Sequence, residues 1–214
     1  MEYNINEIKN ILSGAEKVLT PNCVFCSHYN KLFIDNINLP KNWIYTWGIT
    51  KLVLIPDESD YVIKIPYKGD YSGYEFNAAN RIRGHEWDYC LTENMIYYLA
   101  KKYRLNKFFA KTKPILKINN YQIYAQERVD QHLPFVASRK ERKEMDELCW
   151  QKEIDFVSDA LIYWLVSIKK YYGEEEMLSL LYFLKKYKIE DLHRGNYGWK
   201  SGTPVLLDYS GFND

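Results

Sequence analysis

Three side chains near the end of the sequence have the types and spacing of a site for a metal-bound nucleotide. Asp191 lies in a loop after a predicted helix, Asn196 follows five residues later, and Asp208 ends an apolar strand twelve residues after Asn196. Mg²⁺ prefers carboxylate and amide oxygens as ligands, and phosphoryl transfer also needs a group that receives or orients a proton. The spacing therefore favours Asn196 and Asp208 as metal ligands and Asp191 as the proton acceptor.

Composition and charge exclude several classes of function. The chain has 214 residues, enough for one domain or two closely packed lobes, and 29 basic against 28 acidic residues give it a net charge of +1. This balance indicates no nucleic-acid partner. We expect no membrane segment, because no apolar stretch reaches about 18 residues. Four cysteines do not make a disulfide framework, so we expect a cytoplasmic protein.

The order of the predicted elements indicates an α+β fold with three parts. Residues 1–35 are predicted to form an N-terminal leader with a short amphipathic helix, followed by an N-lobe at 36–129 and a helical C-lobe at 130–214. We expect the N-lobe to contain an antiparallel sheet with one helix, and the C-lobe to contain two helices and a solvated charged run. The ranges are 43–47, 52–55, 61–65, 115–118 and 121–125 for strands, 86–103, 153–171 and 177–187 for helices, and 140–147 for the charged run.

Lys64 and Glu93 are charged residues in otherwise apolar elements. The strand alternation places Val62, Lys64 and Pro66 on one face, so Lys64 is either an edge-strand lysine that discourages aggregation or a cation that binds phosphate. Glu93 interrupts an apolar helix face, where an unpaired buried charge is costly. Lys64 is its natural partner, since an opposite charge would keep both groups ionised.

Five segments, in the order found here, resemble the motifs of protein-kinase-like proteins. Val62-Ile63-Lys64 resembles the lysine strand, and Glu93-Asn94-Met95-Ile96 resembles the segment with the regulatory-helix glutamate. Gln126-Glu127-Arg128-Val129 resembles the hinge that contacts adenine. The segment from Asp191 to Asn196 resembles the catalytic loop, and Asp208-Tyr209-Ser210 lies where such proteins have Asp-Phe-Gly. The catalytic-loop pattern Asp-Leu-His-x-Gly-Asn is closer to atypical and aminoglycoside-phosphotransferase-like kinases, including small proteins of phage or bacterial type. The resemblance covers residues 43–214 and implies a two-lobe kinase-like fold.

The resemblance implies a role for each matched residue. Lys64 would contact the α- and β-phosphates of ATP and Glu93 would hold Lys64, while the main chain of Glu127 and Val129 would bind adenine. Asp191 would be the catalytic base, and Asn196 and Asp208 would bind Mg²⁺. His193 would donate to phosphate oxygens when protonated, or else bond to the main chain of its own loop. Gly48 is the glycine found where a glycine-rich phosphate loop would lie.

The same resemblance implies a reduced C-lobe, because the sequence ends at Asp214 without an activation segment or later helices. The first hypothesis is an ATP- and Mg²⁺-dependent phosphotransferase acting on a protein or small-molecule acceptor. The alternative is a pseudokinase-type interaction protein, such as a phage-encoded inhibitor of a host protein, with or without nucleotide. A third hypothesis is transfer of AMP in place of phosphate.

Cys23, Cys26 and His28 offer three side chains of the type that binds zinc. A structural zinc site needs four ligands, and no second Cys/His pair lies nearby in the sequence. Small buried thiols or a chance pair are the other interpretations.

Overall fold

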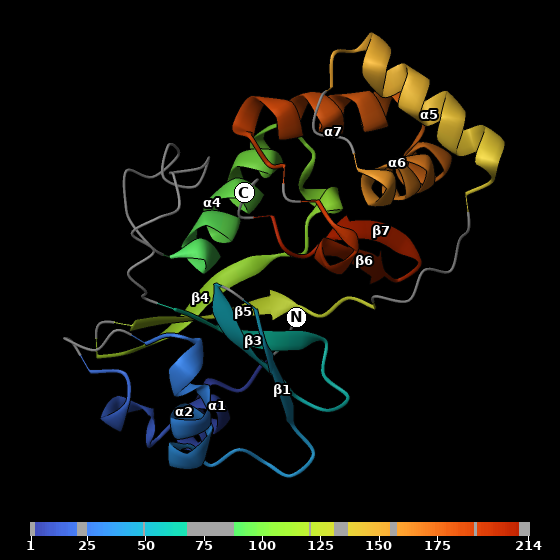
Figure 1. Cartoon of the computed structure of the whole chain (residues 1–214). Coiled ribbons are helices and arrows are strands. Elements are labelled where there is room, and N and C mark those ends of the chain that lie inside the picture. Colours follow the sequence, from blue (N-terminus) through green and yellow to red (C-terminus); the bar gives the residue numbers. More distant parts are fainter. Residues whose placement is uncertain are drawn as a thin grey trace. The chain divides into compact units, whose positions relative to one another are not determined.

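The structure is a computed structural model that describes residues 3–20, 25–48, 50–67, 88–119, 121–130, 137–154, 158–190 and 192–209 (Figure 1). The described residues form two compact units. Unit 1 draws them from Met1–Glu75, Gly84–Met95 and Lys111–Arg128, and unit 2 from Ile96–Ala110 and Val129–Asp214. The coarse α+β class predicted from the sequence is therefore present, and each unit is described by itself below.

Unit 1 contains a five-stranded antiparallel sheet in the order β1-β2-β3-β5-β4. Its strands are β1 (Ile44–Trp47), β2 (Lys51–Ile55), β3 (Tyr61–Pro66), β4 (Thr112–Ile118) and β5 (Tyr121–Glu127). All five predicted strands are confirmed, because their β-branched and aromatic residues suit a pleated sheet. β3 lies in the middle of the sheet, so the interpretation of Lys64 as an edge-strand lysine is wrong.

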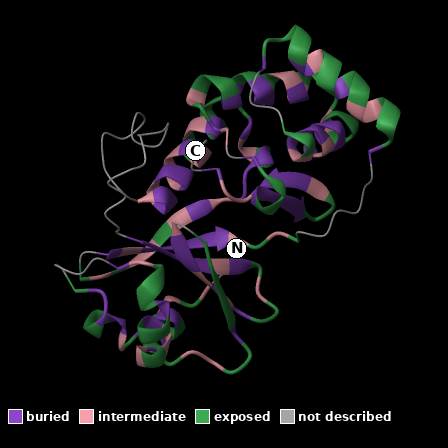
Figure 2. Ribbon diagram, in the orientation of Figure 1, coloured by how far each residue is buried: buried purple, intermediate pink, exposed green. Residues whose placement is uncertain are grey.

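One face of this sheet is apolar and is covered by the N-terminal residues. Leu52, Leu54, Ile63 and Ile65 point to this face and form one core with apolar side chains of the predicted leader. The leader contains α1 (Ile5–Ile11), η1 (Ala15–Lys17), η2 (Ser27–Tyr29) and α2 (Asn30–Asn36). The sequence predicts a separate leader over residues 1–35, whereas in the structure its described apolar side chains complete the core of unit 1. Figure 2 shows the contrast between buried β3 and β1, which is exposed along its whole length.

Ile8 provides a test of this packing. Its side chain is fully buried in α1, so Ile8→Ala is expected to lower the free energy of unfolding by about 2–5 kcal/mol through lost burial and a residual cavity. Denaturant unfolding followed by tryptophan fluorescence would measure the change. Leu32→Ala is the control, since Leu32 is 48% exposed in the same segment. Equal effects of the two variants would contradict the shared core.

The opposite face of the sheet carries polar side chains and lies against the beginning of α4 (Tyr89–Lys102), the helix predicted at 86–103. Residues 89–95 of α4 belong to unit 1 and residues 96–102 to unit 2. Cys90 and Glu93 lie on the buried face of the helix, as the spacing predicts. The helix therefore brings one acidic side chain to the polar face of the sheet.

Unit 2 is mainly helical, with a small two-stranded sheet. It contains the second part of α4, η3 (Asn106–Phe108), α5 (Arg139–Gln151), α6 (Asp159–Tyr172), α7 (Glu174–Tyr187), η4 (Arg194–Asn196), β6 (Tyr197–Lys200) and β7 (Thr203–Leu206). Trp164, Leu165, Leu181 and Leu184 belong to its apolar core. Strands β6 and β7 are antiparallel and joined by Ser201 and Gly202, whose φ angles of 49° and 80° are those of a two-residue hairpin turn.

One prediction for unit 2 needs correction, and another is confirmed. The helix predicted at 153–171 begins only at Asp159, because the Ser158 hydroxyl accepts the N–H of Leu161 and caps the helix there. The charged run at 140–147 belongs to α5, where Ser138 and Glu141 form a capping box. Its exposed ion pairs, Lys140–Glu144 and Lys143–Glu147, agree with the expected solvated face. Within the described residues, no helix is long and apolar enough to cross a membrane.

Candidate functional site

The strongest candidate site in unit 1 is a buried polar cluster around Glu93. The Lys64 ammonium group lies 3.0 Å from Oε1 and 2.9 Å from Oε2 of Glu93. The side chains of Glu93 and Lys64 are 0% and 4% exposed. The ion pair predicted from the sequence between these two residues is confirmed.

A second lysine belongs to the same cluster. Lys51 Nζ lies 2.6 Å from Glu93 Oε1, and its side chain is also 4% exposed. Thr112 donates its hydroxyl to Glu93 Oε2 at 3.1 Å, and the Gln126 amide donates to the same oxygen at 3.2 Å and to the Thr112 hydroxyl at 2.7 Å. One buried carboxylate therefore accepts hydrogen bonds from four side chains, which offsets the desolvation of its charge.

The strand register explains why these side chains meet. Lys64 lies opposite Val53, so Lys51, two residues from Val53, is a diagonal neighbour of Lys64 on the same face. Gln126 lies opposite Val62, which shares the face of Lys64, and Thr112 lies opposite Gln126. Four strands thus bring a lysine, a second lysine, an amide and a hydroxyl to the face beneath α4, and the helix supplies the carboxylate.

The burial of Cys90 shows that water is largely excluded from this region. Cys90 lies one turn before Glu93 on α4 and is fully buried. Burial raises the pKa of the Cys90 thiol well above its usual value, and the negative charge of Glu93 raises it further. Electrostatic interactions are strong in such surroundings, which strengthens the ion pairs of Glu93 with Lys51 and Lys64.

The predicted hinge residues lie at the end of β5 and just beyond it. Gln126 faces the Glu93 cluster, while the N–H of Glu127 donates to the Lys111 carbonyl at 3.0 Å. That N–H is therefore already engaged. Val129 is half-buried and is the first residue of unit 2 after Arg128. Gly48 is exposed directly after β1 and donates its N–H to the Lys51 carbonyl.

In unit 2, the main chain joins Asn196 to Asp208. The Asn196 carbonyl accepts the N–H of Leu207 at 2.9 Å and that of Asp208 at 3.4 Å. Asn196 is buried and Asp208 is half-buried. The prediction that these two residues come close together is confirmed.

Neighbouring residues hold this segment in place. The buried Tyr209 donates its hydroxyl to the Ala110 carbonyl at 2.6 Å, and its ring lies 5.0 Å from that of Phe109. Ala110 in turn donates its N–H to the Leu206 carbonyl. Asp208 is therefore fixed between Leu207 and Tyr209, each of which is hydrogen-bonded to another segment of unit 2.

His193 bonds to its own loop. Its Nδ1 accepts the N–H of Gly195 at 3.0 Å, which matches one of the two alternatives predicted for this side chain. The imidazole is exposed. With Nδ1 used as an acceptor, donation to a phosphate would have to come from Nε2.

Gly195 is required for this arrangement. A Cβ at position 195 would lie 2.8 Å from His193 Cε1, so Gly195→Ala must displace the imidazole. Loss of the hydrogen bond is expected to lower the free energy of unfolding by about 0.5–1.5 kcal/mol. Denaturant unfolding and the histidine NMR signals would report both effects. Gly48→Ala is the control, because a Cβ there meets nothing within 4 Å; an undisturbed His193 signal in Gly195→Ala would contradict the expectation.

Several predicted residues lie outside the described part of the chain. Asp191, Ser210 and Cys23 are among them, so the expected catalytic base and one expected zinc ligand have no described position. Cys26 Sγ and His28 Nδ1 lie 3.7 Å apart. Over the described ranges, no group of three or more His, Cys, Asp or Glu side chains is placed to hold a metal ion.

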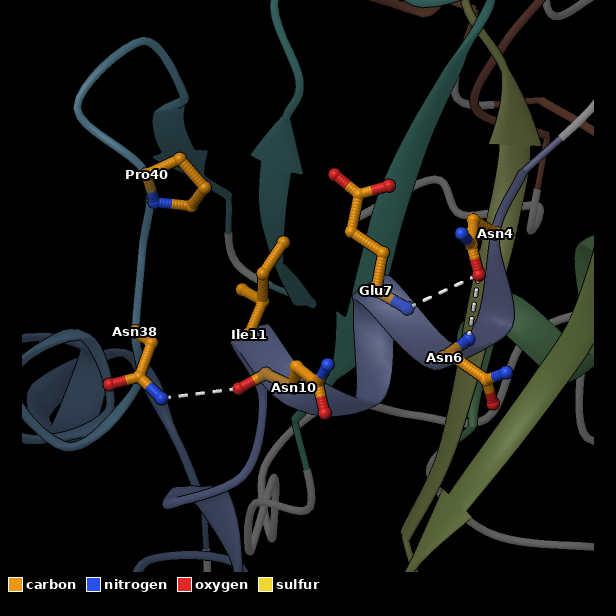
Figure 3. A pocket seen from close by; sticks show the side chains of 7 residues that line it. All are labelled: Asn4, Asn6, Glu7, Asn10, Ile11, Asn38 and Pro40. Atoms are coloured by element: carbon orange, nitrogen blue, oxygen red, sulfur yellow. Dashed lines mark hydrogen bonds between the residues drawn. The ribbon is translucent and has the colours of Figure 1, made fainter.

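A surface hollow of about 450 Å³ lies elsewhere in unit 1, along α1 and the chain after α2 (Figure 3). Asn4 accepts the N–H groups of Asn6 and Glu7, and Asn38 donates to the Asn10 carbonyl. These amides cap α1 and fix the following chain. The hollow contains none of the residues predicted to do chemistry.

Sequence reasoning missed Lys51 and Thr112 as members of the cluster. The predicted strand begins at Leu52, one residue after Lys51, and the predicted fourth strand begins at Ile115, three residues after Thr112. Extending both strands by alternation would have placed these polar residues on the face of Lys64, but only with the strand register known.

Comparison of the chain with protein-family models, with curated proteins and with solved structures gave no match.

Proposed function

We propose that this protein is a kinase-like phosphotransferase that uses ATP and Mg²⁺. The observation that carries the proposal is the buried ion pair between Lys64 on the third strand and Glu93 on the helix that follows it. In protein kinases a lysine of the third strand pairs with a helix glutamate and contacts the α- and β-phosphates. The acceptor of the phosphoryl group is a protein or a small molecule.

Unit 1 supports the proposal through charge and burial. The ammonium groups of Lys64 and Lys51 lie in a region from which water is largely excluded, where a phosphate is bound more strongly than at the surface. Gln126 connects this cluster to the predicted hinge, because it is the residue before Glu127 on β5. Lys64 on β3 and Glu127 on β5 are therefore on neighbouring strands.

Unit 2 supports the proposal through the pairing of Asn196 with Asp208. Main-chain hydrogen bonds hold these two residues close together, and the amide and carboxylate that they carry are suitable ligands for Mg²⁺. In the proposed reaction the metal would neutralise charge on the phosphates, and Asp191 would accept the proton of the attacking hydroxyl. The γ-phosphoryl group would pass from ATP to the acceptor oxygen, leaving ADP.

An assay with γ-labelled ATP tests this function. We expect Mg²⁺-dependent release or transfer of the labelled phosphoryl group by the wild-type protein, and loss of that activity in Lys64→Met. Lys117→Met removes an exposed lysine from β4 of the same sheet and should behave as wild type. Adenylate transfer would instead leave an AMP mass addition on the acceptor.

Binding without turnover would favour the alternative function. A thermal-shift titration with ATP and Mg²⁺ measures binding separately, since a ligand of the folded state raises the melting temperature. A shift without turnover would indicate a pseudokinase-type interaction protein that binds nucleotide. No shift and no turnover would refute the phosphotransferase proposal.

A further inference from the structure

Glu93 differs from a simple paired carboxylate because two ammonium groups contact it. Among the described residues, Lys51 and Lys64 are the cations bonded to Glu93, and the shortest distance, 2.6 Å, belongs to Lys51. The two lysines come from adjacent strands and point to the same carboxylate from diagonal positions of the sheet. All three side chains are at most 4% exposed.

This arrangement matters when Lys64 binds an anion. An ammonium group has three N–H donors, so Lys64 must share them between Glu93 and an incoming phosphate. With Lys64 as its only cation, Glu93 would lose part of its ion pair at that moment, and a buried carboxylate that loses its partner is strongly destabilised. Lys51, Thr112 and Gln126 are also bonded to Glu93, so they would be its remaining partners when Lys64 turns to a phosphate.

We propose that Lys51 is a positioning residue that serves as a second counter-ion to Glu93 and so frees Lys64 to bind the phosphates of a nucleotide. This inference rests on the proposed function, because it takes Lys64 as the phosphate-binding lysine. Lys51 acts on the ligand through Glu93, and its contribution depends on the negative charge at position 93.

The dependence on Glu93 gives a test by rescue, with MgADP as the probe and calorimetric titration as the measurement. Lys51→Met is expected to weaken MgADP binding about 10-fold, the change that corresponds to about 1.4 kcal/mol. In the double variant Lys51→Met/Glu93→Gln, position 93 has no negative charge that competes with the phosphate for Lys64. The affinity for MgADP is therefore expected to return toward the wild-type value. Adenosine, which has no phosphate, should bind the wild type and Lys51→Met equally.

Each other result of this titration overturns the proposal. Wild-type affinity in Lys51→Met would show that Lys51 does not assist Lys64. Equally weak binding by Lys51→Met and by the double variant would show that the effect of Lys51 does not depend on the charge of Glu93. A parallel loss of adenosine binding would show general damage to unit 1.

Unfolding measurements keep the inference testable if the wild-type protein binds no MgADP, a result that would refute the proposed function by itself. Lys51→Met and Lys64→Met each leave Glu93 with one lysine, whereas Lys51→Met/Lys64→Met leaves it with none. We therefore expect the double variant to lower the melting temperature by more than the sum of the two single shifts. Additive shifts in melting temperature would show that the two lysines do not share Glu93. This result would refute the assignment of Lys51 as a second counter-ion.

Discussion

Replacing Glu93 by alanine is expected to lower the free energy of unfolding by about 3–5 kcal/mol, the cost of breaking a buried ion pair from one side. The change removes the single acceptor of five hydrogen bonds from Lys51, Lys64, Thr112 and Gln126. It also leaves two ammonium groups buried without the carboxylate that they both contact. This is one of the largest stability effects that we expect from one substitution in unit 1.

Denaturant unfolding would measure this effect, with Glu144→Ala as the matched control. Glu144 also lies on a helix and near a lysine, but its side chain is 60% exposed and 3.8 Å from Lys140. Exposed ion pairs contribute about 0–1 kcal/mol, so Glu144→Ala should be close to neutral. Similar effects of the two variants would mean that the Glu93 cluster does not stabilise unit 1.

Asp208→Ala is expected to reduce Mg²⁺-dependent phosphoryl transfer by at least about 100-fold, because metal coordination stabilises transition-state charge by several kcal/mol. Its stability should change little, since Asp208 is half-buried and lies outside the apolar core. The segment around it remains fixed by Tyr209 and by the bond from Leu207 to Asn196. This variant should therefore lose activity while its free energy of unfolding stays close to that of the wild type.

Steady-state rates over a range of Mg²⁺ concentrations would test the metal role directly. Asp146→Ala is the control, an exposed aspartate on α5 whose loss should leave the rates unchanged. A normal rate and normal Mg²⁺ dependence in Asp208→Ala would remove Asp208 from the metal site. A collapse in melting temperature would show instead that Asp208 is structural.

Local patterns were sufficient to predict the five strands of the unit 1 sheet, helix α4 and the pairing of Lys64 with Glu93. Alternation identified each strand, and an isolated acid on an apolar helix face indicated a buried partner of opposite charge. Lys64, a charged residue on the predicted third strand, was the partner expected for this acid. The strand and helix assignments depend only on residues close in sequence, whereas the pairing of Lys64 with Glu93, 29 residues apart, depends on the high cost of burying an unpaired charge.

The remaining features depend on register and on distant packing, which local patterns do not specify. Lys51 meets Glu93 only because Val53 pairs with Lys64, and no pattern within β2 shows that pairing. The sequence pattern of the leader is that of an independent amphipathic segment. Only the structure shows that its apolar side chains pack against the apolar face of the sheet. The start of α6 was placed too early because the apolar pattern extends before the Ser158 cap.

The packing of the N-terminal residues against the sheet affects the order in which the units fold during synthesis of the chain. The apolar residues of α1 and α2 are made first, but the strands that complete their core end only at Glu127 of β5. Unit 1 can then close while later residues are still being added. Folding of unit 2 is expected to be completed later, because the N–H of Ala110 donates to the carbonyl of Leu206, almost a hundred residues further along the chain. The two units are therefore expected to mature in sequence during translation, with unit 1 folding first.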